Sequence, residues 1–93
     1  MTIQELLQNG AKIVDVRTEA EFMGGSVANA INIPLNEVPQ RVAEFQEMEG
    51  PIVLCCLSGG RSGQATGYLQ SQNVECYNGG SWMDVNFAMS QTS

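Results

Sequence analysis

The sequence predicts an α/β fold, with a small doubly wound parallel sheet of four to five strands flanked by helices on both faces. Short apolar runs alternate with helix-like segments along the chain, and strands joined by helical crossovers form parallel sheets. The run 52–56 is continuously apolar, which is typical of a central strand buried on both faces. With 93 residues, 43% of them hydrophobic, the chain can bury one small core. We therefore expect residues 1–93 to form a single domain.

The first two expected helices share one N-terminal signal. Thr2 with Glu5, and Thr18 with Glu21, have the Thr-x-x-Glu spacing of a capping box, in which each side chain accepts a hydrogen bond from the other residue's backbone amide. Glycine readily adopts the left-handed conformation that ends a helix. The expected ends of these two helices are Asn9-Gly10 and Gly24-Gly25.

A third helix is expected after Pro34. Asn36 can cap it, and Pro39 is tolerated in its first turn. Its inner face is expected to consist of Val38, Val42 and Phe45. The remaining helices are expected over 63–72 and 81–89, and the strands over 12–16, 30–33, 52–56 and 74–77.

The helix over 63–72 contains two glycines, Gly63 and Gly67, four residues apart on one face. Each glycine costs a helix about 1 kcal/mol relative to alanine. We therefore expect this face to approach another backbone closely, most naturally that of the sheet. Ala65 and Leu69 are expected to complete the apolar surface of the helix.

The strongest functional signal is the connection between the third expected strand, 52–56, and the helix that follows it. This stretch reads Cys56, Leu57, Ser58, Gly59, Gly60, Arg61, Ser62. Amides at a helix N-terminus carry partial positive charge, and Arg61 adds a full one. Both lower the cost of a thiolate, which is the reactive form of cysteine. We interpret Cys56 as a nucleophile in an anion-binding loop, whose glycines let the amides turn inward. Ser58 and Ser62 either donate hydroxyl hydrogen bonds or serve as turn and cap residues.

The structural alternative is an ordinary strand–helix connection that contains a buried cysteine, and such cysteines are common. Neighbouring strand residues face opposite sides of a sheet, so Cys55 should point away from the face of Cys56. We expect Cys55 and Cys76 to be small core residues. Resolution of an oxidised Cys56 is the other role open to Cys55.

Three further site candidates follow from the topology. Open parallel α/β folds bind ligands at the carboxyl ends of their strands, where the sequence places Asp15 and Arg17 as well as Cys56. Asp15 and Arg17 either support the site or form a structural ion pair or cap. Trp82, which follows Gly79-Gly80, either lines the pocket or packs as a half-buried aromatic, and we favour the structural role.

Several blocks of this sequence, in this order, resemble the rhodanese-like (sulfurtransferase) family. They are 15–22, 25–34, 56–62 and the late Gly79-Gly80. The resemblance spans nearly the whole chain. Two departures stand out: Ser26 stands where the family usually has histidine, in a chain without any histidine, and the segment before Gly79 is shorter than usual.

The resemblance implies a rhodanese-like fold and sulfur transfer in two half-reactions. Cys56 would take the sulfane sulfur of a small-molecule donor such as thiosulfate, and the amides from Leu57 to Arg61 would hold the terminal sulfur. Cyanide, a thiol, a protein cysteine or a thioredoxin-like reductant would then accept that sulfur. Arg61 is expected to order the loop and contribute charge.

Two other functions stay open. Cysteine phosphatases and arsenate reductases use a similar loop with one residue more between cysteine and arginine, so the four residues between Cys56 and Arg61 disfavour them. A persulfide carrier or protein-interaction module with little small-molecule turnover is the non-enzymatic alternative, because a fold alone does not fix a function.

Composition excludes several classes of function. A formal net charge of −6 with only four basic residues gives no surface for nucleic acid. No run approaches the roughly 20 apolar residues of a membrane span, and the N-terminus lacks the features of a signal peptide. Three cysteines without histidine or Cys-x-x-Cys spacing give no metal-binding pattern. We expect a cytoplasmic monomer with reduced thiols and no metal or cofactor.

Overall fold

The structure is a computed structural model that describes residues 1–91. Within these residues, four parallel strands form one sheet in the order β2-β1-β3-β4. The elements in chain order are α1 (Ile3–Gln8), β1 (Lys12–Asp15), α2 (Glu19–Met23), β2 (Ile31–Asn32), the 3₁₀ helix η1 (Leu35–Arg41), α3 (Val42–Glu47), β3 (Ile52–Cys56), α4 (Gly60–Ser71), β4 (Cys76–Ser81) and α5 (Trp82–Ser90). No helix among residues 1–91 is long and apolar enough to span a bilayer.

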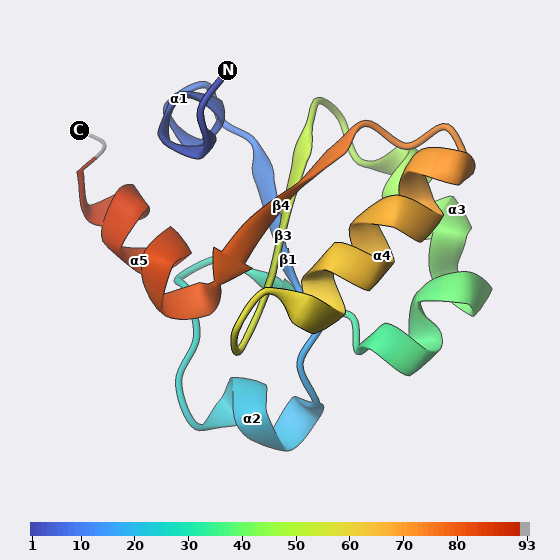
Figure 1. The fold of residues 1–93 in the computed structure, drawn as a ribbon, viewed down its shortest axis with the longest axis horizontal. Coiled ribbons are helices and arrows are strands. Elements are labelled where there is room, and N and C mark those ends of the chain that lie inside the picture. Colours follow the sequence, from blue (N-terminus) through green and yellow to red (C-terminus); the bar gives the residue numbers. More distant parts are fainter. Residues whose placement is uncertain (92–93) are drawn as a thin grey trace.

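Helices cover both faces of the sheet, as predicted (Figure 1). One core lies between the sheet and the segment η1–α3 together with α4, and it includes Phe45 and Leu54. A second core lies between the sheet and the pair α1 and α5, and it includes Val53 and Val85. The doubly wound α/β prediction is therefore confirmed.

Strand β3 contributes to both cores because successive side chains alternate between its faces. Ile52, Leu54 and Cys56 belong to the first core, and Val53 and Cys55 belong to the second. None of the five residues is more than 1% exposed. This confirms that a continuously apolar run marks the central strand, and that the two adjacent cysteines face apart.

The order of the strands defines where a ligand can bind. β1 pairs with β2 on one side and with β3 on the other. The chain therefore reverses its direction of winding between β1 and β3, and open α/β sheets bind ligands at this switch point, beyond the carboxyl ends of the strands. Those ends carry Asp15 and Cys56, with Asp15 in register with Cys55.

The two predicted capping boxes are present, at Thr2 with Glu5 and at Thr18 with Glu21. The predicted cap at Asn36 is wrong. The chain instead enters η1 directly after Pro34, without a side-chain cap, and α3 begins only after this 3₁₀ segment. The reason is Pro39 inside η1, which lacks the amide that a continuous α-helix would use. The predicted inner face is nevertheless turned toward the core: it comprises the buried Val38 and Phe45 and the partly buried Val42.

Strand β4 differs most from its prediction, since it was expected over 74–77. It starts later because the amide of Val74 still donates to Leu69 at the end of α4. It continues to Ser81 because β4 accommodates one extra residue: Leu54 pairs with Asn78, and Cys55 pairs with Gly80. Strand β1 ends one residue earlier than predicted, and β2 is one residue shorter at each end.

Helix α4 begins three residues before its predicted start, and its glycines do not act as predicted. A Cβ atom added to Gly63 would lie 3.3 Å from Nδ2 of Asn78, which is a side chain and not a backbone. An atom added to Gly67 would meet nothing within 4 Å. The expected close approach of this face to the sheet backbone is therefore wrong, while Ala65 and Leu69 are buried as predicted.

Candidate active site

Cys56 ends β3, and the chain turns sharply from it into α4. Gly59 makes this turn possible with a φ of +101°, in the left-handed region that favours glycine. A Cβ atom on Gly59 would also lie 3.3 Å from the Cα of Gly80 on β4. The sequence prediction that a glycine closes this loop is therefore supported by both backbone conformation and packing.

The sulfur of Cys56 is buried among hydrogen-bond donors. The amide of Gly59 donates to Sγ at 3.0 Å, and Oγ of Ser62 lies 3.4 Å from it. Burial alone would raise the pKa of the thiol. Hydrogen bonds from the Ser62 hydroxyl and amide, together with those from the amides of Gly59 and Ser58, outweigh burial and lower the pKa below its usual value. The loop thus favours the reactive thiolate.

Arg61 lies where it can order the loop, which is one of the two roles predicted for it. Its guanidinium donates to both carboxylate oxygens of Glu21, at 2.8 and 3.0 Å, and so ties the loop to α2. The hydrogen bond from Arg61 lowers the pKa of Glu21 to about 2. The pKa of Arg61 is raised mainly by Glu21 and to a smaller extent by the charge on Cys56. Because Glu21 offsets the positive charge locally, hydrogen bonds dominate the stabilisation of the thiolate.

Asp15 and Arg17 form a buried ion pair, with 2.7 Å between Oδ2 of Asp15 and Nη2 of Arg17. The backbone amide of Arg17 also donates to Asp15, and the guanidinium donates to the carbonyl oxygen of Gly25 at 2.7 Å. The ring of Trp82 lies 4.8 Å from Cζ of Arg17 and packs on the second core. These contacts give all three residues a structural role, while a direct role toward Cys56 stays a prediction.

The other two cysteines have environments that suppress ionisation. Burial, and next the charge of Asp15, raises the pKa of Cys55 to about 12. Burial raises the pKa of Cys76 to about 11. Both side chains lie in the core, as predicted, and all three cysteines are free thiols. Cys56 is therefore the cysteine that ionises first.

Asn78, which contacts the loop from β4, is not among the site residues predicted from the sequence. Its Nδ2 donates to the carbonyl oxygen of Gly59 at 3.1 Å, and its Oδ1 accepts from the hydroxyl of Ser62 at 2.7 Å. The prediction ended β4 one residue too early to place Asn78 on the strand. A polar residue just before Gly79, on the strand beside β3, is the signal that could have identified it.

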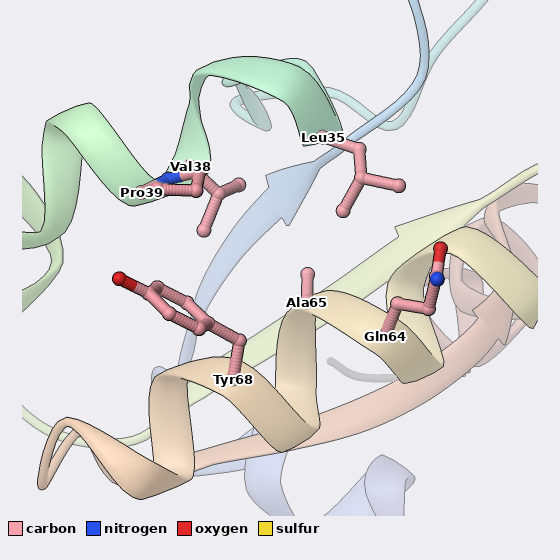
Figure 2. Close-up of a pocket in the computed structure, with 6 residues that line it drawn as sticks. All are labelled: Leu35, Val38, Pro39, Gln64, Ala65 and Tyr68. Carbon is pink, nitrogen blue, oxygen red and sulfur yellow. The ribbon is translucent and has the colours of Figure 1, made fainter.

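A separate cavity of about 320 Å³ lies between η1 and α4 (Figure 2). Its lining residues are Leu35, Val38, Pro39, Gln64, Ala65 and Tyr68. Figure 2 shows the Gln64 amide and the Tyr68 ring at opposite ends of this mostly apolar hollow. The lining contains no residue of the segment 56–62, so the cavity is distinct from the cysteine loop.

The family model that describes the rhodanese-like domain matches residues 2–82 of this chain. A protein described as a sulfurtransferase from Allochromatium vinosum is 38% identical over 60 residues, which cover 64% of this chain and 55% of that protein. The thiosulfate sulfurtransferase GlpE of Pseudomonas aeruginosa is 29% identical over 75% of this chain and 63% of its own length. The chain thus spans about half the length of the first curated relatives that it matches.

Solved structures with similar folds cover most of the chain. Protein SSP1007 of Staphylococcus saprophyticus has a TM-score of 0.77 and 33% identity, with 92% of this chain and 90% of that chain covered. The human single-domain sulfurtransferase TSTD1 has a TM-score of 0.72 and 28% identity, with 98% and 92% covered. A rhodanese with anions from E. coli has a TM-score of 0.72 and 31% identity, with 81% and 91% covered.

Proposed function

Because this chain belongs to the rhodanese-like domain family, we propose that it is a sulfurtransferase that carries a sulfane sulfur on Cys56 as a persulfide. The observation that carries the proposal is the setting of the Cys56 sulfur. A backbone amide lies 3.0 Å and a hydroxyl 3.4 Å from it, in the loop that begins α4. Donors fixed in this way stabilise an anionic sulfur before and after transfer.

The first half-reaction loads the cysteine. The Cys56 thiolate attacks the outer sulfur of a donor such as thiosulfate, and a new sulfur–sulfur bond forms. The sulfur–sulfur bond of thiosulfate breaks, and sulfite leaves with its electron pair. The lowered pKa of Cys56 provides the thiolate without a separate general base, which suits a chain that contains no histidine.

The second half-reaction removes the sulfane sulfur from Cys56. An acceptor such as cyanide or a thiolate attacks the terminal sulfur of the persulfide. The bond to Cys56 breaks, and the cysteine regains its thiolate electron pair. Since the first product leaves before the acceptor reacts, the kinetics are of the ping-pong type.

The dimensions of the loop support sulfur over a phosphoryl group as the atom transferred. Only four residues separate Cys56 from Arg61, and Cys56 is 1% exposed. A small ring of amides around a buried sulfur suits one added sulfur atom better than a tetrahedral oxyanion. We accordingly expect negligible hydrolysis of p-nitrophenyl phosphate, and steady hydrolysis that disappears in Cys56→Ser would contradict this choice.

Intact-mass measurement tests the proposed function directly. After exposure to thiosulfate, the protein is expected to gain the mass of one sulfur atom and to lose it when cyanide is added. Cys56→Ser should not gain this mass, whereas the matched control Cys76→Ser should gain it like the wild type. A gain that persists in Cys56→Ser would show that another cysteine is the nucleophile and would overturn the proposal.

A sulfur carrier for a protein acceptor is the second candidate, and one observation favours it. Leu57, the residue after the cysteine, is 57% exposed although it is apolar. An exposed leucine beside the sulfur suits contact with a protein cysteine or a thioredoxin-like reductant. Fast thiocyanate formation from thiosulfate and cyanide distinguishes an enzyme from a carrier, whose persulfide would form but turn over slowly.

A further inference from the structure

The side-chain amide of Asn78 makes three hydrogen bonds, and two of them join β4 to the segment that follows Cys56. Nδ2 donates to the carbonyl oxygen of Gly59 at 3.1 Å. Oδ1 accepts from the hydroxyl of Ser62 at 2.7 Å and from the amide of Gly80 at 3.0 Å. The amide of Gly80 can only donate, so it fixes which end of the Asn78 side chain faces Ser62.

Both loop residues that Asn78 holds donate hydrogen bonds to the sulfur. The amide of Gly59 lies 3.0 Å from Sγ of Cys56, and Oγ of Ser62 lies 3.4 Å from it. Asn78 is therefore connected to the sulfur by two separate paths, each of which passes through one other residue. One path runs through the backbone of Gly59, whose carbonyl oxygen accepts from Asn78 and whose amide donates to the sulfur. The other path runs through the side chain of Ser62 on the first turn of α4.

The path through Ser62 is shared between two acceptors. A hydroxyl has one hydrogen, and the carbonyl oxygen of Asn78 has none to give, so Ser62 is the donor at 2.7 Å. When Cys56 ionises, its sulfur becomes a charged acceptor that attracts the same hydrogen. Oγ of Ser62 already lies at the required distance, so only its hydrogen has to rotate.

We propose that Asn78 is a positioning residue, which holds the Gly59 amide and the Ser62 hydroxyl against the sulfur of Cys56 and so promotes its ionisation. The role of Cys56 as the sulfur-carrying nucleophile rests on the proposed function. The contribution of Asn78 to the state of the thiol does not depend on it. The side chain of Asn78 acts through its two neighbours and makes no bond to the reacting sulfur.

The one-residue irregularity in β4 explains how Asn78 reaches the loop. Asn78 pairs with Leu54, while Gly80 pairs with Cys55, so Gly79 is the extra residue of β4. Asn78 thus stays on the face of the sheet that α4 covers, beside Gly63. Asn78 is itself exposed, so its replacement removes hydrogen bonds but little core packing.

Several other ionisable groups lie on the elements packed around the Cys56 loop. They are Cys55 on β3, Asp15 and Arg17 at the end of β1, Glu21 on α2, Arg61 on α4 and Asp84 on α5. Substitution of Asn78 alters none of them. A change in the ionisation of Cys56 in Asn78 variants therefore reports the loss of the amide clamp, by which we mean the hydrogen bonds of the Asn78 side chain to Gly59 and Ser62.

The test follows the ultraviolet absorbance of the thiolate against pH, with Cys56→Ser as the blank. Asn78→Ala is expected to raise the midpoint by about one pH unit, which is about a tenfold smaller thiolate fraction below the midpoint. Asn78→Asp, of nearly the same size, should raise it further, because it loses the donor to Gly59 and adds a negative charge. The matched control Asn86→Ala, on the exposed face of α5, should not move it.

A midpoint that is unchanged in both Asn78 variants would overturn the proposal. A lower midpoint in Asn78→Ala would also overturn it, since that result would mean that Asn78 mainly competes for the hydrogen of Ser62. In a Ser62→Ala background, the shift caused by Asn78→Ala should shrink, because one of the two paths is already lost. A full shift in that background would exclude the path through Ser62.

Sulfur loading separates this inference from the proposed function. If the wild type gains no sulfur from thiosulfate while the Asn78 variants still shift the midpoint, the proposed function fails and the positioning role stands. If the wild type gains sulfur and the midpoints do not shift, the positioning role fails and the proposed function stands.

Discussion

Cys55 and Cys56 are identical side chains at adjacent positions, and their chemistry differs because of the face on which each one lies. Cys55 points into the second core, where burial and the nearby Asp15 raise the pKa of its thiol to about 12. Cys56 points to the other face, where hydrogen bonds from Ser62 and Gly59 outweigh burial and lower its pKa. Strand alternation thus selects the nucleophile between two neighbours.

Gly79 is a second position where the site depends on one residue, because its neighbours leave no room for a Cβ atom. A Cβ atom at this position would lie 2.7 Å from Cγ1 of Val53 and 2.8 Å from Cγ2 of Val85. The extra residue of β4 therefore fits only without a side chain. Because Asn78 immediately precedes it, the path of the chain at Gly79 also determines where the Asn78 amide reaches the loop.

We expect Gly79→Ala to lower the free energy of unfolding by about 1–3 kcal/mol, because a methyl group would be forced into a filled core. Gly67→Ala is the matched control: nothing lies within 4 Å of the added atom, and the site is inside α4. It is expected to raise stability by up to about 1 kcal/mol through helix propensity. Urea unfolding of both variants measures the difference, and equal effects would show that the contacts around Gly79 relax freely.

Among the elements, α2 is held to the molecule mainly by polar contacts. It contains no buried residue. Arg17 donates to the carbonyl oxygens of Glu21, at 3.3 Å, and of Gly25, at 2.7 Å. Arg61 forms the ion pair with the Glu21 side chain across 40 residues of sequence. The element beside the cysteine loop is thus attached through two guanidinium groups.

Replacement of Glu21 by glutamine should loosen α2. Hydrogen exchange of its amides is expected to become faster, because the ion pair with Arg61 is lost while the capping geometry can be kept. Glu5→Gln is the matched control, since Glu5 has the same capping position in α1 and takes part there with Thr2. The loss of protection in α2 should exceed that in α1, and the difference should shrink in high salt. Equal losses in the two helices would show that capping alone holds α2.

Patterns formed by residues close in sequence predicted the helix starts at Thr2 and Thr18 well. Contacts between residues distant in sequence could not be predicted in this way. The capping boxes at Thr2 and Thr18 depend only on local spacing, and both are present. The start of α3 was missed because Pro39 favours a 3₁₀ turn over the expected α-helix. For the site, the loop residues could be identified from their order, whereas the Glu21 partner of Arg61 and the amide clamp of Asn78 depend on tertiary packing.

At the scale of the whole molecule, the sheet separates two cores and places a buried thiol in each of them. Cys55 lies in the core beneath α1 and α5, and Cys76 lies in the core beneath α4. Burial is the main cause that raises their pKa values to about 12 and about 11, from an ordinary value of 9.0. The fold therefore resists ionisation of both thiols more strongly than the unfolded chain does.

This difference predicts a loss of stability in alkali. Above pH 9.0 the unfolded chain releases the protons of Cys55 and Cys76, while the folded chain keeps them up to about 12 and about 11. The unfolded state then binds fewer protons, so the free energy of unfolding falls as pH rises, by at most about 1.4 kcal/mol per pH unit for each thiol. Cys56, whose pKa is lowered on folding, has the opposite sign: its contribution is already complete above 9.0 and is lost as pH falls through its folded value.

Urea unfolding at about pH 8 and about pH 10 tests this account, since groups common to all variants cancel in the comparison. Cys55→Ala and Cys76→Ala should each be less stable than the wild type at the lower pH, because each leaves a small void. Between the lower and the higher pH, the free energy of unfolding of each variant should fall by about 1 kcal/mol less than that of the wild type, because one ionising thiol is missing. Cys56→Ala should decline at least as steeply as the wild type, because the thiol that it removes has the opposite sign. A decline of the same size in the wild type and in both core variants would mean that the buried thiols ionise without unfolding, and the two cores would then be more accessible to water than their packing indicates.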